Sequence, residues 1–362
     1  VAASRRVDDL FEWAEALGGR VSKVRVEDCG ARGDGLVAAD DIPEGELVAT
    51  IPRELALGVG GGCCRAAELI AQNVEDDDLW AVGLAAELML LRARIGALDA
   101  LAARPGQEDD ANAPPAPADN AANAAAVFWA PYVTSLPAGA AGFPLYMDRK
   151  ELAALQYPPV SAEVERRFEY LRQFMYDVVQ PLAVASGALP PDGLKLDTLG
   201  WAFVTVSSRA MRVGAEAGSG GALMPVLDMA NHSASPNARV RQSAVSGDYQ
   251  LQATRAIAAG EEVTISYGDL SNDDLFLNHG FFVDGFDEEG TAAEEEPAAS
   301  APQPANPHDV VQIWLGLPLL EAGAAKAREL GLAGAEALPQ SVAQAAAEPW
   351  RAAALQALGV PT

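Results

Sequence analysis

Strand-like runs occupy two separated parts of the 362-residue chain, and the residues between them follow a helical pattern. Short apolar runs punctuated by turn residues cover 20–60, and similar runs return over 200–285. Residues 61–199 instead repeat apolar side chains at helical spacing. Each strand-rich part is too short to bury a core by itself, so the two parts are expected to pack together. The predicted fold class is α+β, with a helical subdomain inserted into one β domain.

The individual elements follow from the same patterns. Helices are expected over 7–19, 66–101, 149–156 and 162–183, and strands over 22–30, 35–42, 46–55, 201–211, 222–232, 249–257 and 262–268. Residues 104–126 and 284–307 are rich in alanine, proline and acidic side chains. Such segments bury too little apolar surface to offset the entropy of ordering them, so both are expected to be mobile loops. The glycine cluster at 58–64 is interpreted as a linker.

Composition excludes several classes of partner. The chain carries 51 acidic and 25 basic residues, a formal charge of −26, which argues against nucleic acid and against an anionic membrane surface. The apolar run 79–91 is 13 residues long and contains Glu87, so no transmembrane helix is predicted. Three cysteines without zinc or disulfide spacing favour a reducing intracellular compartment.

Three short stretches could carry chemistry. Gly30, Gly33 and Gly35 precede a strand and allow a backbone to bend close to a ligand, although a simple hairpin gives the same pattern. The stretch 225–237, PVLDMANHSASPN, ends a strand-like run in turn residues. Its Asp228 and His232 have metal-ligand spacing only on a helix, which those turn residues disfavour, and no third ligand has suitable spacing. The stretch 260–282 places a tyrosine at a strand end, as a core residue before a turn also would be.

Taken in this order, the three stretches resemble the SET-domain protein methyltransferases. Residues 128–139 and 144–156 narrow the resemblance to the class of the Rubisco large-subunit lysine methyltransferase and the actin-histidine methyltransferase, and the resemblance covers about 10–350. It implies a SET-domain β fold with a knot-like core, split over 20–60 and 200–285. It also implies an inserted helical subdomain over 61–199, a disordered linker over 284–307 and a C-terminal helical substrate-binding region over 308–362.

The resemblance also implies a cofactor, a set of site residues and no metal. The cofactor is S-adenosyl-L-methionine, and its expected binding residues are Arg32, Gly33, Asp34, Gly35, Arg209, Asn231, His232, Tyr267 and Phe281. The expected substrate-binding residues are Arg209, Ala210, Asp228, Tyr267 and His279. Tyr267 is the expected catalytic residue.

The implied activity is methyl transfer to a lysine amine of a non-histone protein by a monomer in the cytoplasm, chloroplast or nucleus. His279 departs from the tyrosine common in the family and puts the methylation number and the acceptor amine in question. Ala210 and Leu270 are closer to the lysine-methylating members than to the histidine-methylating ones. A histidine methyltransferase and a non-catalytic SET-fold binding module stay open as alternatives. An unrelated metal enzyme and a Rossmann methyltransferase are less compatible, the latter because strands and helices do not alternate.

Overall fold

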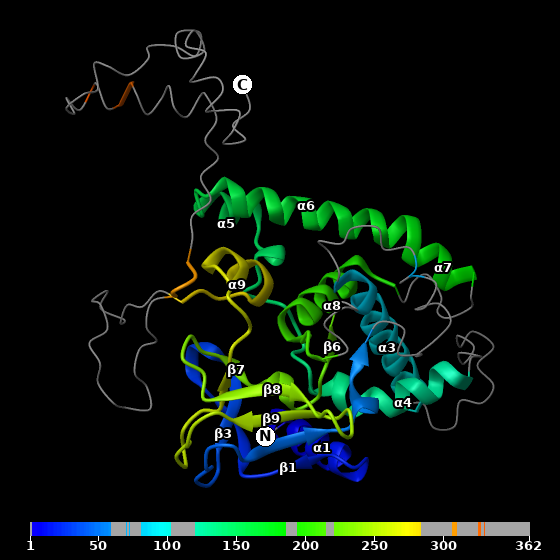
Figure 1. Cartoon of the computed structure of the whole chain (residues 1–362). Coiled ribbons are helices and arrows are strands. Elements are labelled where there is room, and N and C mark those ends of the chain that lie inside the picture. Colours follow the sequence, from blue (N-terminus) through cyan, green and yellow to red (C-terminus); the bar gives the residue numbers. More distant parts are fainter. Residues whose placement is uncertain are drawn as a thin grey trace. The chain divides into compact units, whose positions relative to one another are not determined.

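The computed structural model describes residues 2–58, 70, 72, 81–102, 120–185, 194–214, 221–283, 306–309, 325, 326 and 329. The chain divides into two compact units, Val1–Asp309 and Val310–Thr362. The first unit carries the elements described below (Figure 1). In the second, Lys326 pairs with Glu329 at 2.7 Å. The predictions for the glycine cluster after Gly58, for 104–119, for 284–305 and for most of 310–362 lie outside the described residues.

A four-stranded antiparallel sheet joins the two strand-rich parts of the sequence. Its order is β1 (Arg20–Val21), β4 (Leu47–Ile51), β9 (Tyr249–Ala253) and β8 (Ala238–Gln242). Alternate side chains of β9 are fully buried, as expected for a strand with one face on a core. Because β4 pairs with β9 across about 200 residues of sequence, the prediction that the two parts pack together is confirmed.

Three two-stranded pairs extend this β unit. β2 (Val24–Asp28) and β3 (Asp34–Ala38) form an antiparallel hairpin around a 3₁₀ turn, Gly30–Arg32. β5 (Leu57–Gly58) pairs with β6 (Ala222–Leu223). β7 (Asn231–His232) lies parallel to β10 (Thr264–Ile265), so two segments with candidate site residues run side by side.

Most helices come from the inserted residues, and in Figure 1 α5 and α6 lie above the β unit while α1 lies at its base near β1. The helices are α1 (Ala2–Ala16), α3 (Ala81–Ala102), α4 (Asn120–Ser135), α5 (Arg149–Ala154), α6 (Pro158–Phe174), α7 (Gln180–Ala185), α8 (Leu196–Arg209) and α9 (Asn272–His279). A π-helical turn, Met175–Val179, joins α6 to α7, and short 3₁₀ turns cover Arg53–Leu55, Pro144–Tyr146 and Leu227–Met229. α3 packs against α4 and α8, and its residues 81–91 are all buried. None of the described helices combines the length and apolar character that crossing a bilayer requires.

Two strand predictions are wrong. Residues 201–209 belong to helix α8 because Leu199–Val206 are buried on every side of it. A helix that is apolar all round has the same uninterrupted apolar sequence as a buried strand. Over 222–232, only the first and last two residues are strand. Between them, Val226 adopts φ 72° and a 3₁₀ turn follows, so the chain reverses inside the core.

Several boundaries also differ from the prediction, and two of them concern the site or the loops. α4 begins at Asn120, inside the segment predicted as a loop over 104–126, because Ala122 and Ala126 are buried. The strand predicted over 262–268 is reduced to the two residues of β10. Beyond that strand the chain turns at Gly268, which has φ 122°, before Ser271 caps α9.

Candidate active site

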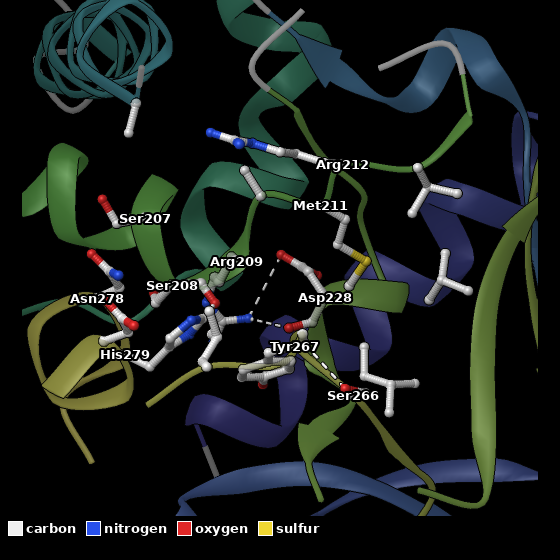
Figure 2. Close-up of a pocket in the computed structure, with 18 of the residues that line it drawn as sticks. Ser207, Ser208, Arg209, Met211, Arg212, Asp228, Ser266, Tyr267, Asn278 and His279 are labelled. Carbon is white, nitrogen blue, oxygen red and sulfur yellow. Dashed lines mark hydrogen bonds and ion pairs between the residues drawn. The ribbon is translucent and has the colours of Figure 1, made fainter. Parts of the chain in front are cut away.

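A cavity of about 730 Å³ opens between the C-terminal end of α8, the segment that follows it, β8 and the start and end of α9 (Figure 2). Five residues named from the sequence line it: Arg209, Ala210, Asp228, Tyr267 and His279. They come from four separate parts of the chain, which the turn at 227–229 and the β7–β10 pairing bring together.

Tyr267 lies two residues beyond β10 and is held at both ends. Its backbone N–H donates to His232 Nδ1 at 3.2 Å, and its hydroxyl donates to the carbonyl oxygen of Ala230 at 3.1 Å. Burial raises the pKa of the phenol to about 12, against the smaller opposing effect of Arg209. The hydroxyl is therefore protonated at neutral pH, in a fixed position beside the cavity.

Three rings lie around this tyrosine. His279 stacks on Tyr267 with centroids 4.7 Å apart and planes 27° apart, while His232 and Phe281 lie 5.3 Å and 6.5 Å from the same ring. His279 Nδ1 is 3.2 Å from the carbonyl oxygen of Ser208. A carbonyl can only accept, so the bonded tautomer carries its proton on Nδ1 and leaves Nε2 as an acceptor. Burial lowers the pKa of His279 to about 4, so the ring is neutral at physiological pH.

A buried ion pair forms the floor of the cavity. Arg209 Nη1 lies 3.6 Å from Asp228 Oδ2 and donates to the Asp228 carbonyl oxygen at 3.0 Å. Tyr132, from α4, donates its hydroxyl to the same carboxylate oxygen at 2.7 Å. Burial raises the pKa of Asp228, and Arg209 and Tyr132 oppose that rise. Asp228 Oδ1 is buried and has no hydrogen-bond partner among the described residues.

A second group of polar residues gathers around Glu262. Asn231 donates its side-chain amide to Glu262 Oε1 at 2.8 Å, and Arg32 forms an ion pair with Oε2 of the same carboxylate. A Cβ on Gly35 would lie 2.6 Å from the Asn231 amide nitrogen and 2.8 Å from Glu262 Oε1. Cys29 lines the same place, and burial raises the pKa of its thiol to about 11. We call Arg32, Gly35, Asn231 and Glu262 the cradle.

The residues predicted from the sequence thus fall into two neighbouring groups. One lines the cavity, and the other forms the cradle. His232 connects them, because it follows Asn231 in β7 and contacts Tyr267 through its ring and Nδ1. Gly33 ends the 3₁₀ turn with φ 70°, and Asp34 is exposed at the start of β3, opposite Asp28.

Three residues of the site were missed from the sequence. Glu262 accepts a hydrogen bond from the Asn231 amide and forms an ion pair with Arg32. Its acidic side chain at the start of an otherwise apolar strand is the sequence feature that could have identified it. Tyr132 and Ser208 act through a side chain and a backbone carbonyl that no sequence pattern marks. Over the described part of the chain, no group of three or more His, Cys, Asp or Glu side chains is arranged to hold a metal ion.

Comparisons with known proteins agree with this geometry. The family model described as the SET domain matches residues 33–268. Actin-histidine N-methyltransferases from Canis lupus familiaris and Homo sapiens are 27% and 26% identical to this chain over 324 residues. The matches cover 85% of this chain but only 45% and 44% of those proteins, so the chain spans under half of their length.

Solved structures share the fold. The SET domain of LSMT bound to lysine and AdoHcy superposes with a TM-score of 0.57 and 21% identity, over 77% of this chain and 57% of that one. Rubisco LSMT bound to AdoMet gives a TM-score of 0.55 and 20% identity, over 76% and 56%. The region that the family model matches contains β3, the strands β7 and β10 that lead to Tyr267, and the Arg209–Asp228 pair of the cavity. The chain belongs to the SET domain family.

Proposed function

We propose that the protein is an S-adenosyl-L-methionine-dependent methyltransferase acting on a lysine side chain of a non-histone protein. The observation that carries this proposal is the position of Tyr267. Its protonated hydroxyl is fixed beside the cavity, while its ring contacts His232 on the cradle side. A residue that lies between two sites suits a reaction in which a cofactor and a substrate meet. The SET domain family and the names of the relatives support methyl transfer.

The cradle residues fit the proposed cofactor. Gly35 leaves room where any larger side chain would meet Asn231, and the Asn231 amide and Arg32 supply donors for a carboxylate. When bound, S-adenosylmethionine supplies a methyl group already activated by the positive charge of its sulfonium. We propose Arg32, Gly33, Asp34, Gly35, Arg209, Asn231, His232, Tyr267 and Phe281 as its binding residues.

The chain's own residues then have two tasks. An ordinary lysine has a pKa near 10.4, so only about 1 in 2,500 is neutral at pH 7, a handicap of about 4.6 kcal/mol. A cavity beside a cation favours the neutral amine by desolvation and like-charge repulsion. The Tyr267 hydroxyl and nearby carbonyls then hold the amine in line for displacement.

A histidine acceptor is the second candidate, because the curated relatives are named actin-histidine N-methyltransferases. We favour lysine as the acceptor because Ala210 and Leu270 are closer to the lysine-methylating members of the family. Both residues line the cavity. We also propose the split SET domain over 20–60 and 200–285, the inserted helices over 61–199 and a substrate-binding role for 308–362.

Calorimetric titration tests the cofactor assignment and the cradle together. Wild-type protein is expected to bind S-adenosylmethionine, and the product S-adenosylhomocysteine should compete for the same site. Absence of binding by a folded protein would refute the proposed function.

Gly35→Ala is expected to weaken that binding by about ten-fold or more, or about 1.4 kcal/mol. The new methyl group would displace the Asn231 and Glu262 side chains, which are free to move without unfolding the chain. The melting temperature should therefore change little. Gly96→Ala is the matched control, because nothing lies within 4 Å of a Cβ there and alanine suits a helix. Equal affinity in wild type and Gly35→Ala would remove the cradle from the cofactor site.

His279→Tyr is expected to change the number of methyl groups added without abolishing transfer. Tyrosine would replace the acceptor Nε2 of His279 with a longer side chain whose hydroxyl can also donate a hydrogen bond. The change lies where the His279 ring stacks on Tyr267 beside the cavity. A hydrogen bond of about 1 kcal/mol changes the ratio of mono- to trimethylated product about five-fold. Mass spectrometry of a methylated peptide measures that ratio, and an unchanged ratio would place His279 outside the acceptor channel.

A further inference from the structure

Tyr132 reaches the candidate active site from the inserted helices. It lies on α4, and its buried side chain donates a hydrogen bond from the hydroxyl to Asp228 Oδ2 at 2.7 Å. Arg209 Nη1 lies farther from the same oxygen, at 3.6 Å, and Oδ1 is buried without a hydrogen-bond partner among the described residues. Of these contacts the one from Tyr132 is the shortest, so it sets the orientation of the Asp228 carboxylate.

The first group that depends on this carboxylate is the Arg209 side chain. Its Nη1 contacts both the carboxylate and the carbonyl oxygen of Asp228, as the dashed lines in Figure 2 show. Arg209 ends α8 and lines the cavity together with Tyr267. Because a guanidinium is directed by the acceptors that it meets, rotation of the Asp228 carboxylate would move Arg209 out of this position.

The second group is the Tyr267 hydroxyl. Asp228 lies in the 3₁₀ turn Leu227–Met229, and Ala230 follows this turn. The Ala230 carbonyl oxygen accepts a hydrogen bond from the Tyr267 hydroxyl at 3.1 Å. The turn is strained at its start, because Val226 is a buried β-branched residue at φ 72° and ψ −49°. Such a backbone persists only where surrounding contacts hold it, and the hydrogen bond from α4 to the turn is one of these contacts.

The helix that carries Tyr132 is held in place by its neighbours. α4 packs against α1 and α3, and the Trp129 ring contacts the Tyr132 ring with centroids 6.3 Å apart. Just beyond α4, the Pro137 carbonyl oxygen accepts a hydrogen bond from Trp201 of α8 at 2.8 Å. The Tyr132 hydroxyl therefore reaches Asp228 from a fixed support.

We propose that Tyr132 is a positioning residue for methyl transfer, which acts by fixing Asp228. The contacts of Asp228 and its turn then place Arg209 and the Tyr267 hydroxyl beside the acceptor amine. The proposal rests on the proposed function, in which these two groups bind the acceptor and align it. Through this one contact the inserted helices control the alignment of the acceptor, and an acceptor that binds out of line reacts more slowly.

Tyr132→Phe is expected to lower the single-turnover rate about ten-fold at saturating S-adenosylmethionine. The acceptor is a mixed library of synthetic peptides with a central lysine or histidine, and mass spectrometry counts the added methyl groups. Affinity for S-adenosylmethionine should stay within about three-fold of wild type, because Glu262 holds the cradle and does so without Asp228. A tyrosine with a structural role alone would lower the melting temperature and leave the rate per folded molecule intact.

Tyr157→Phe is the matched control for this variant. Tyr157 also donates its hydroxyl to a carboxylate, that of Asp273 at 3.0 Å, but neither residue lines the cavity. Its rate should stay within about two-fold of wild type. Adding Tyr132→Phe to Asp228→Asn should cost no more than about three-fold, because both changes act on the same contact. Independent losses that multiply would show that Tyr132 acts elsewhere, and would overturn the proposal.

A measurement without turnover separates this inference from the proposed function. The chain has seven tyrosines, so labelling with 3-fluorotyrosine gives a small set of ¹⁹F resonances, and the Tyr267 resonance is the one lost in Tyr267→Phe. Tyr132→Phe is expected to shift that resonance, and Tyr157→Phe should leave it in place. A shift without methyl transfer by wild type would refute the proposed function and leave the coupling of Tyr132 to Tyr267. Transfer by Tyr132→Phe at the wild-type rate would overturn this inference alone.

Discussion

Tyr267→Phe is expected to lower the turnover number by about 100-fold or more, which corresponds to about 3 kcal/mol of lost transition-state alignment. The hydroxyl is protonated and is fixed by the Ala230 carbonyl, so phenylalanine removes one oriented group and leaves the ring contacts in place. Cofactor affinity should stay within about two-fold of wild type, because the Tyr267 N–H bond to His232 is retained. Single-turnover kinetics at saturating cofactor measures the effect.

Tyr146→Phe is the matched control for this variant. Tyr146 also donates its hydroxyl to a backbone carbonyl, that of Asp197 at 2.8 Å, but it does not line the cavity. The control should lose about 1 kcal/mol of stability and keep its rate per molecule. A Tyr267→Phe protein with the same loss of stability and an intact rate would make Tyr267 a core residue without a role in transfer.

Arg209→Met is expected to lower the free energy of unfolding by about 3 kcal/mol at pH 7. The change leaves the Asp228 carboxylate buried without its cation, and removing one member of such a pair typically costs 3–5 kcal/mol. The lower end applies because 24% of the Arg209 side chain is exposed to solvent. Denaturant unfolding monitored by circular dichroism measures the change.

The same variant should recover stability as the pH falls. Burial already raises the pKa of Asp228 above its unfolded value, and loss of Arg209 raises it further. A group with a raised pKa in the folded state contributes stability below its unfolded pKa, and that contribution is lost as the pH rises through the folded pKa. The deficit of Arg209→Met should therefore be smaller near pH 4 than at pH 7. Adding Asp228→Asn should also reduce the deficit at pH 7, and an equal deficit at both pH values would contradict a charged Asp228.

The sequence predicted most where a residue type at its position in the chain has a single physical explanation. Two strand-rich parts that are each too short to bury a core were enough to predict that these distant parts pack together, and β4 pairs with β9 in one sheet. Arg209, Asp228 and Tyr267 at the cavity, and the cradle residues other than Glu262, could be named because their motifs resemble a known family. The structure then brings them into two adjoining groups.

What the sequence could not supply depends on contacts between distant residues. α8 was mistaken for a strand because complete burial removes the polar face that distinguishes a helix. Tyr132 reaches Asp228 from 96 residues away, and His279 bonds the Ser208 backbone from 71 residues away. Glu262 became visible as the centre of the cradle only when β3 and β10 were placed together, with Glu262 bridged to Val37.

Transfer of a deuterated methyl group from labelled S-adenosylmethionine into a fractionated proteome tests the central claim most directly, when mass spectrometry identifies the labelled residue. The account predicts label on a lysine of a non-histone protein with wild-type enzyme, and little or none with Tyr267→Phe at equal protein concentration. Label on a histidine would correct the acceptor while leaving the site in place. The absence of label with a folded protein that binds the cofactor, or equal label from wild type and Tyr267→Phe, would contradict methyl transfer at this site.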